Sequence, residues 1–336
     1  MMTQQPIRRR MIVTLTTFGL LLVAVLLAAP LLGSTSISLA RVFDRAMPFA
    51  DNTDAQIFFI ARLPRVLAAA IVGASLAAAG VVFQALLRNP LATPDTLGVS
   101  SGAALGAMLA ITFHLDLTFA GIPTMPLASF AGSLGALGIV YALATARRRG
   151  LSTIVLLLAG VTMTAFFQAL IMFTQYIADF TDTYRTVRWL MGTLDVASYA
   201  PILAVLPIVV VAFAMLATLP RSLDLISLGA DAAAARGVNV LAAERLALAS
   251  ASLATGAAVS LAGPVGFIGL VVPHLVRLFV GSDHRLVLPA SALFGAAFLI
   301  SCDLVARTVL SSGELPVGVV TALIGGPFFL WLLVKK

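Results

Sequence analysis

Long runs without a charged side chain dominate this 336-residue sequence and leave it few folds to adopt. The charge-free runs are 11–40, 66–87, 96–115, 117–146, 150–178, 196–220, 246–276, 286–302 and 315–334. Most of them reach the roughly 20 apolar residues that a helix needs to cross the hydrocarbon core of a bilayer. Backbone amides inside that core must be paired internally, which favours helices. The sequence therefore predicts an all-α, polytopic membrane protein.

One run is too long for a single crossing. As one helix, 246–276 would be roughly 46 Å long at about 1.5 Å per residue, against a hydrocarbon core of about 30 Å. It also contains Gly263-Pro264, where proline removes a backbone donor and favours a turn. We therefore predict two spans here, roughly 243–262 and 265–281, and ten transmembrane helices in all.

The distribution of positive charge predicts the topology. Ten spans place 14 of the 21 Lys and Arg residues on the side of the two termini, whereas nine spans would divide them 11 to 10. Cytoplasmic loops carry the excess of Lys and Arg, so we expect both termini in the cytoplasm. Arg8 to Arg10 could also open a secretory signal peptide, but no clear cleavage site precedes Arg41, and an uncleaved first span is favoured.

Composition excludes several other classes of protein. Only 10% of residues are charged and 60% are hydrophobic, so membrane lipid is the main environment. The net charge of +7 comes from basic residues scattered among loops, which gives no reason to expect a nucleic-acid partner. Cys302 is the single cysteine and cannot form an intramolecular disulfide.

Small residues predict close contacts between helices. Gly98, Gly102 and Gly106 recur every four residues along one predicted span, and Gly73 begins a similar series in the span before it. Helices in lipid associate through small residues that let their backbones approach. Packing within one bundle is the favoured interpretation, and a seam between two subunits is the alternative.

The cytoplasmic segment 221–245 is long and rich in alanine. Residues 231–236 have high helix propensity, and Gly229 and Gly237 stand at their two ends. We expect a short helix outside the membrane. It could be a simple connector, but two capped turns favour a helix that is offered to a soluble partner.

Several motifs occur together and in order. They read RLPR at 62–65, GVVFQ at 80–84, RNPLATPDTLGVSSGA at 88–103, LLLAGV at 156–161, WLMG at 189–192, LG at 228–229, RGV at 236–238, AGPVGFIGLVVPHLVR at 262–277, LPVG at 315–318 and GGPFF at 325–329. This set resembles the permease subunits of binding-protein-dependent ABC importers for iron-siderophore, haem and cobalamin. The likeness covers about residues 60 to 334, and it implies a single permease domain over 1–336 with the type II ABC importer permease fold.

The resemblance also implies partners. These permeases form homodimers around a translocation path, with two cytoplasmic ATPase subunits and a periplasmic binding protein, in the bacterial inner membrane. No Gly-x-x-x-x-Gly-Lys-Ser/Thr sequence occurs here, so ATP and Mg are expected on the partner ATPase, with no cofactor and no catalytic residue in this chain. By the resemblance, the 221–245 segment couples to that ATPase through Leu228, Gly229, Ala233, Ala234, Arg236 and Gly237.

Three arginines are expected at the extracytoplasmic mouth. The resemblance implies that Arg62, Arg65 and Arg307 meet acidic residues on the lobes of the binding protein. Anchoring of the helix ends is the alternative interpretation, because lone basic residues there commonly extend to the interface. Asp303 precedes Arg307 by four residues, which would also allow an ion pair within one helix.

The resemblance assigns a cytoplasmic gate to Asn89 and Leu91 at the end of the second span, with Ser152 and Thr153 as a second constriction. The alternatives are local: Asn89 before Pro90 suits a turn, and Ser152 suits a helix N-cap. The sequence leaves these alternatives open.

The expected cargo is a large metal chelate, a ferric siderophore, haem or cobalamin, and the sequence does not select among them. Tyr199 stands where a tryptophan is common in the family, near the expected substrate entrance. His114, His274 and His284 are not at ligand spacing, so we predict no metal site.

An ion-coupled secondary transporter is the alternative function, but it would need acidic or histidine residues near mid-membrane, and no Asp or Glu falls in the centre of a predicted span. A channel would need charged rings or a filter motif, and neither occurs.

Overall fold

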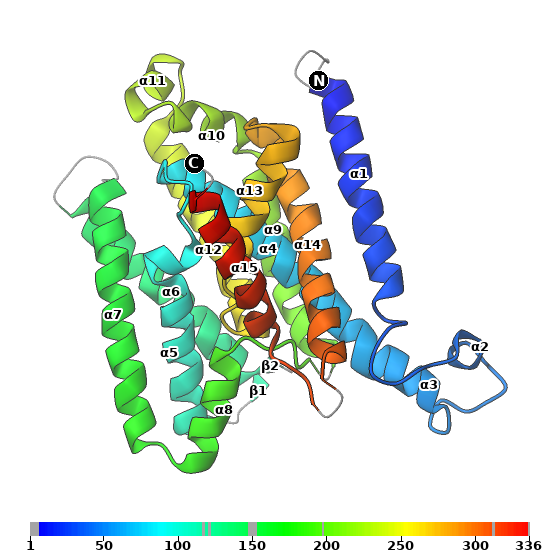
Figure 1. Cartoon of the computed structure of the whole chain (residues 1–336). Helices are drawn as coiled ribbons and strands as arrows, with labels where there is room; N and C mark the ends of the chain where they lie inside the picture. Colours follow the sequence, from blue (N-terminus) through cyan, green and yellow to red (C-terminus); the bar gives the residue numbers. More distant parts are fainter. Residues whose placement is uncertain are drawn as a thin grey trace.

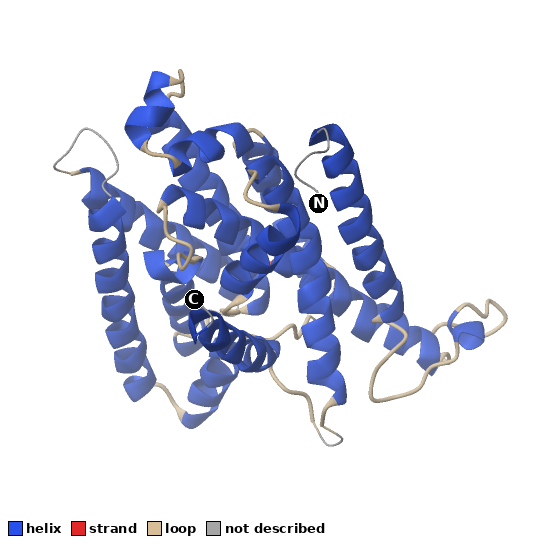
Figure 2. Ribbon diagram, turned by 45° about the horizontal axis from the view of Figure 1, so that its top comes forward, coloured by secondary structure: helices blue, strands red, loops and turns tan. Residues whose placement is uncertain are grey.

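The long apolar runs fold into helices in the computed structural model of the chain (Figure 1), which describes residues 7–115, 118–119, 122–146, 153–196, 198–310 and 313–334. The elements are α1 Ile7–Ala28, α2 Leu39–Val42, α3 Thr53–Gln56, the π-helix η2 Ile57–Arg62, α4 Leu63–Leu86, the 3-10 helix η3 Pro94–Leu97, α5 Val99–Thr112, β1 Thr118–Phe119, β2 Ile122–Pro123, α6 Thr124–Thr145, α7 Thr153–Ile177, α8 Phe180–Leu190, α9 Ala200–Ala217, α10 Pro220–Ser227, α11 Ala230–Ala235, α12 Val240–Ala262, α13 Ile268–Val280, α14 His284–Thr308 and α15 Val317–Val334. Strands β1 and β2 pair antiparallel. Apart from this two-residue ladder and the connecting loops, the described chain is helical (Figure 2).

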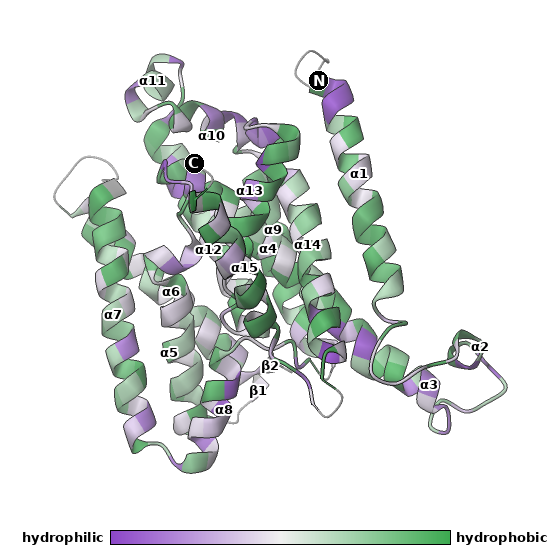
Figure 3. Cartoon of the chain, in the orientation of Figure 1, coloured by the Kyte–Doolittle hydropathy of each residue, from purple (hydrophilic) through white to green (hydrophobic). Residues whose placement is uncertain are grey.

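The described helices account for the ten predicted spans. Seven helical segments are long and apolar enough to cross a membrane: Ile7–Ala28, Thr53–Leu86, Thr124–Thr145, Ile154–Ile177, Ala200–Ala217, Val240–Ala262 and His284–Thr308. Three shorter apolar helices complete the set, Val99–Thr112, Ile268–Val280 and Val317–Leu332. Hydrophobic residues follow these helices along their length, while hydrophilic residues gather near their ends (Figure 3). The all-α, polytopic fold predicted from the sequence is confirmed.

The predicted division of the longest apolar run is also confirmed. Helix α12 ends at Ala262 and α13 begins at Ile268. Gly263, between them, has a φ of +68°, and a Cβ atom there would stand 2.5 Å from the Trp189 carbonyl oxygen. Glycine meets both demands because it tolerates positive φ and has no side chain to clash.

Helix α4 is the buried centre of the bundle and packs against α12, α13 and α14. Glycine permits these contacts. A Cβ atom on Gly73 would stand 2.2 Å from the Gly295 carbonyl oxygen of α14, and one on Gly80 would stand 2.1 Å from the Gly269 carbonyl oxygen of α13. Such backbone contacts between small residues hold helices together where lipid offers no hydrophobic driving force.

A second glycine contact joins α5 to α6. A Cβ atom on Gly102 would stand 2.5 Å from the Gly132 carbonyl oxygen, and one on Gly106 would stand 2.1 Å from that of Ala128. For these two glycines, the interpretation as packing within one bundle is confirmed. The third, Gly98, instead ends η3 in the left-handed conformation, with a φ of +75°.

The two ends of the bundle differ in what they carry. Helices α10 and α11 lie at the same end as the N-terminal end of α1 and the C-terminal end of α15, towards the top of Figure 1. Helices α2, α3 and α8 lie at the opposite end, together with the β1–β2 pair. The candidate coupling and docking residues are therefore on opposite ends.

Candidate functional site

Arg62 is buried at the end of the bundle that carries α3. It is the last residue of the π-helix η2 and is only 6% exposed. The guanidinium donates hydrogen bonds to the carbonyl oxygens of Pro30 at 3.1 Å and Leu31 at 3.2 Å, and also to that of Thr35. Arg62 therefore fastens the segment that follows α1 to the start of α4.

Arg307 acts on the same segment from the other side. It is 5% exposed and donates to the carbonyl oxygens of Ala29 at 3.3 Å and Leu32 at 3.4 Å. Its Nε atom also lies 3.0 Å from an Asp303 carboxylate oxygen one turn earlier in α14. The ion pair within one helix, considered from the sequence, is confirmed.

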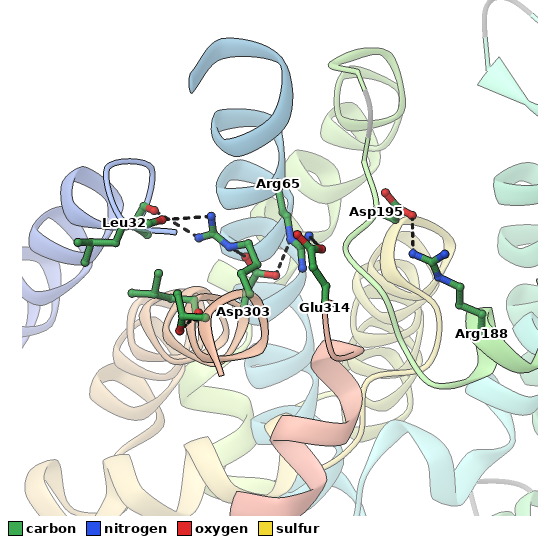
Figure 4. A network of polar contacts seen from close by, with 10 residues as sticks. Leu32, Arg65, Arg188, Asp195, Asp303 and Glu314 are labelled. Carbon is green, nitrogen blue, oxygen red and sulfur yellow. Dashed lines mark hydrogen bonds and ion pairs between the residues drawn. The ribbon is translucent and has the colours of Figure 1, made fainter. Parts of the chain in front are cut away.

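Arg65 joins this network to the surface (Figure 4). Its Nε atom donates to Asp303 at 2.7 Å, and a terminal nitrogen pairs with Glu314. The Asp303 side chain is fully buried, that of Arg65 is 13% exposed and that of Glu314 is 53% exposed. The network therefore runs from a buried carboxylate, through a mostly buried arginine, to a carboxylate at the rim.

A cavity of about 370 Å³ opens beside these residues. Its lining includes Arg62, Arg65, Arg307 and Glu314, and also Asp195. Asp195 is paired with Arg188 at 3.2 Å, and both side chains are largely exposed. The structure thus brings the three predicted docking arginines together. Arg62 and Arg307 are occupied by internal partners, and Arg65 is the one that leads to Glu314 at the rim. The docking role itself stays a prediction.

The predicted gate residues lie in the loop after α4 and at the start of α7. The Asn89 side-chain oxygen accepts a hydrogen bond from the Leu91 amide at 3.0 Å, which is the local turn considered from the sequence. Leu91 is 46% exposed and lines a small cavity of about 40 Å³ together with His274 and Phe328. Thr153 is the first residue of α7, and Ser152 lies outside the described residues. The gate role stays a prediction.

The short helix predicted within 221–245 exists as α11, which projects from the bundle beyond α10 (Figure 1). Gly229 before it and Gly237 after it both have positive φ, +124° and +82°. Ala233 is fully buried in a cluster with Ile226 and Ala243, which fixes one face of α11. The other face is open: Leu228, Ala234 and Arg236 are exposed. The helix is confirmed, and its coupling to an ATPase stays a prediction.

Two polar contacts that sequence reasoning did not find tie this end of the bundle together. His284 Nδ1 lies 2.6 Å from Asp224, so α10 is bound to the start of α14. Arg277 of α13 donates to the Gln84 side-chain oxygen of α4. Each partner stands more than 50 residues from the other, and no local pattern indicates such pairs. The ring of His284 therefore has a partner within this chain.

The start of α14 is capped by Asp283, whose carboxylate accepts from the Arg285 amide at 2.9 Å and pairs with its guanidinium at 2.8 Å. Burial raises the pKa of the Asp283 carboxyl, but the hydrogen bonds and charge of Arg285 outweigh burial and hold that pKa below its ordinary value. A cavity of about 530 Å³ next to this cap is lined by Arg88, Asn89, Asp224 and Arg277. The surface between α10 and the start of α14 is therefore polar and charged.

A bundle of apolar helices in the described chain, seven of them long enough to cross a membrane, with charged clusters at its two ends, defines a multi-pass membrane protein. The sequence profile of the FecCD transport family matches residues 20–335, and the chain belongs to that family. This assignment does not favour the ion-coupled secondary transporter.

Named relatives include the cobalamin import permease BtuC of Halobacterium salinarum, 47% identical over 81% of this chain and 72% of that protein. The hemin permease HmuU of Yersinia pestis is 38% identical over 95% of each chain. The vitamin B12 permease BtuC of Vibrio cholerae is 40% identical over 86% of each chain.

Solved structures agree with the fold. A metal-chelate type ABC transporter, solved in an inward-facing conformation, superposes with a TM-score of 0.84 and 32% identity, over 96% of this chain and 99% of the other. PsaBC from Streptococcus pneumoniae superposes with a TM-score of 0.52 at 18% identity, over 80% of this chain and 89% of that one. The second likeness concerns the fold alone.

Proposed function

We propose that this chain is the permease subunit of an ABC importer that moves a large metal chelate across the bacterial inner membrane. Two copies would enclose the path, two ATPase subunits would bind ATP and Mg on the cytoplasmic side, and a periplasmic binding protein would deliver the cargo. The observation that carries the proposal is the family match over residues 20–335. The three relatives named above are permeases for cobalamin, vitamin B12 and hemin.

The projecting helix α11 supports a role for a separate ATPase. One of its faces is packed on the bundle through Ala233, and the other is exposed through Ala234 and Arg236. An exposed helix that is held rigidly at its base can pass a displacement from a soluble partner to α10, and from there to α14 through Asp224 and His284. Leu228, Gly229 and Gly237 would set the angle at which α11 enters the ATPase.

The opposite end would receive the binding protein, chiefly at Arg65, with Arg62 and Arg307 holding the surrounding surface. Charged rim residues steer and orient such an encounter more than they add affinity. At the cytoplasmic end, Asn89, Leu91, Ser152 and Thr153 would narrow the path. The excess of Lys and Arg on the side of the termini supports a cytoplasmic location for both ends.

The test is transport by the reconstituted complex. The chain would be co-purified with its partner ATPase and binding protein and placed in proteoliposomes. Haem, a ferric siderophore and cobalamin would be supplied in parallel. We expect ATP-dependent accumulation of one of these chelates. Uptake that follows an ion gradient and needs no ATPase would contradict the proposal.

A further inference from the structure

Arg65 pairs with two carboxylates that differ in their exposure to solvent. Asp303 contacts its Nε atom from α14, and Glu314 contacts a terminal nitrogen from the segment that leads into α15 (Figure 4). The Asp303 side chain is fully buried, whereas that of Glu314 is 53% exposed. The two contacts differ in how easily they can be broken.

The inner contact, between Arg65 and the buried Asp303, is the harder of the two to break. Asp303 also pairs with Arg307 at 3.0 Å, so loss of this carboxylate would leave Arg307 without its counter-charge and Arg65 with only the exposed Glu314. Buried charges with no partner are strongly unfavourable. The outer contact is weak by comparison, because water and salt compete for an exposed ion pair. Within the part of the chain that the structure describes, the Glu314 carboxylate pairs with the Arg65 guanidinium.

The charge of the cluster also singles out Glu314. Arg62, Arg65 and Arg307 carry three positive charges, and Asp303 and Glu314 carry two negative ones. All but the fully buried Asp303 line the cavity of about 370 Å³. If Glu314 moved away, the rim would gain positive charge at Arg65. A carboxylate from outside could then take the same place on the same guanidinium nitrogen.

We infer that Glu314 is an internal substitute for an acidic side chain of the docking binding protein, and that docking exchanges one carboxylate for the other on Arg65. This inference rests on the docking role in the proposed function. In the exchange one ion pair replaces another, so Arg65 is never left without a counter-charge. Glu314 would therefore lower the affinity of the undocked permease for its partner.

The experiment measures binding of the substrate-binding protein that supports uptake in the proteoliposome assay to the permease–ATPase complex in nanodiscs. Glu314→Gln keeps the shape of the side chain and removes the competing charge. We expect its dissociation constant to fall by roughly fivefold at low salt. The difference should shrink at high salt because exposed charges are screened.

Asp195→Asn is the matched control. It removes the same charge from the wall of the same cavity, but Asp195 is paired with Arg188 and not with Arg65. A second control places Glu314→Gln in an Arg65→Gln background, where the substitution should have no effect if the two residues act on one contact. Thermal unfolding of each variant would establish that the complex is intact.

The possible results distinguish a failure of the carboxylate exchange from a failure of docking at Arg65. If Glu314→Gln binds like the parent, or if Asp195→Asn gains as much affinity, the exchange does not occur. Arg65→Gln would still lose binding in that case, and docking at Arg65 would stand. If Arg65→Gln binds the partner normally, docking at this arginine and the exchange are both wrong.

Discussion

Gly80 of α4 and Gly269 of α13 are in direct backbone contact: a Cβ atom on Gly80 would stand 2.1 Å from the Gly269 carbonyl oxygen. Because α4 is the buried centre of the bundle, this contact sets how closely α13 can approach it. The position has no room for any side chain.

Gly80→Leu should therefore separate α13 from α4 and destabilise the fold by about 1–3 kcal/mol or more, the usual cost of overpacking. Gly135→Leu is the control, because a Cβ atom on exposed Gly135 of α6 meets nothing within 4 Å. Thermal unfolding in detergent would compare the two. Equal stability of both variants would show that the α4–α13 contact is not close.

Asp303→Asn tests the buried ion-pair network. It leaves the guanidinium groups of Arg65 and Arg307 without their shared counter-charge, and breaking a buried pair costs about 3–5 kcal/mol. Arg188→Gln breaks an exposed pair with Asp195 and should cost about 1 kcal/mol or less. The measurement is the unfolding midpoint of the detergent-solubilised protein. A midpoint for Asp303→Asn as high as that of Arg188→Gln would contradict the prediction.

Ala234→Pro tests coupling through α11. Proline inside this helix costs roughly 3 kcal/mol in helix propensity, while the membrane helices are untouched. We expect normal insertion and dimerisation but no transport, with an ATPase that dissociates or no longer responds to loaded binding protein. Ala234→Ser, at the same exposed position, should transport normally. Full uptake by the proline variant in proteoliposomes would rule out the coupling role.

Cysteine reporters test the topology. A reporter at Ala234 or Asn89 should be protected from a membrane-impermeant thiol reagent added outside, and one at Gly313 should be labelled. Gly313 suits a cysteine because it is exposed and a Cβ atom there meets nothing within 4 Å. Gly263, the other candidate position at this end, is unsuitable because it has positive φ and a Cβ atom there would meet the Trp189 carbonyl oxygen. Native Cys302 is buried and gives little background. External labelling at Ala234 would reverse the orientation.

Local features of the sequence were sufficient to predict most of the helices and where they end. The length of each charge-free run determines whether it can span a bilayer, and Gly263-Pro264 ends α12 at Ala262 because its backbone cannot continue the helix. Gly229 and Gly237 likewise bound α11 through their own positive φ. These properties belong to neighbouring residues, so they can be read along the chain.

The candidate sites depended on the tertiary structure. The partners of Arg65 are 238 and 249 residues away, and Arg62 is buried because the segment after α1 folds over it. The π-helix that ends at Arg62 has no signal in the apolar pattern. Sequence by itself determined that arginines stand at this end of the bundle. Only the packing of α1, α4 and α14 decided which of them are enclosed by internal partners and which one faces the rim, because ion pairing depends on distance in space and not on separation along the chain.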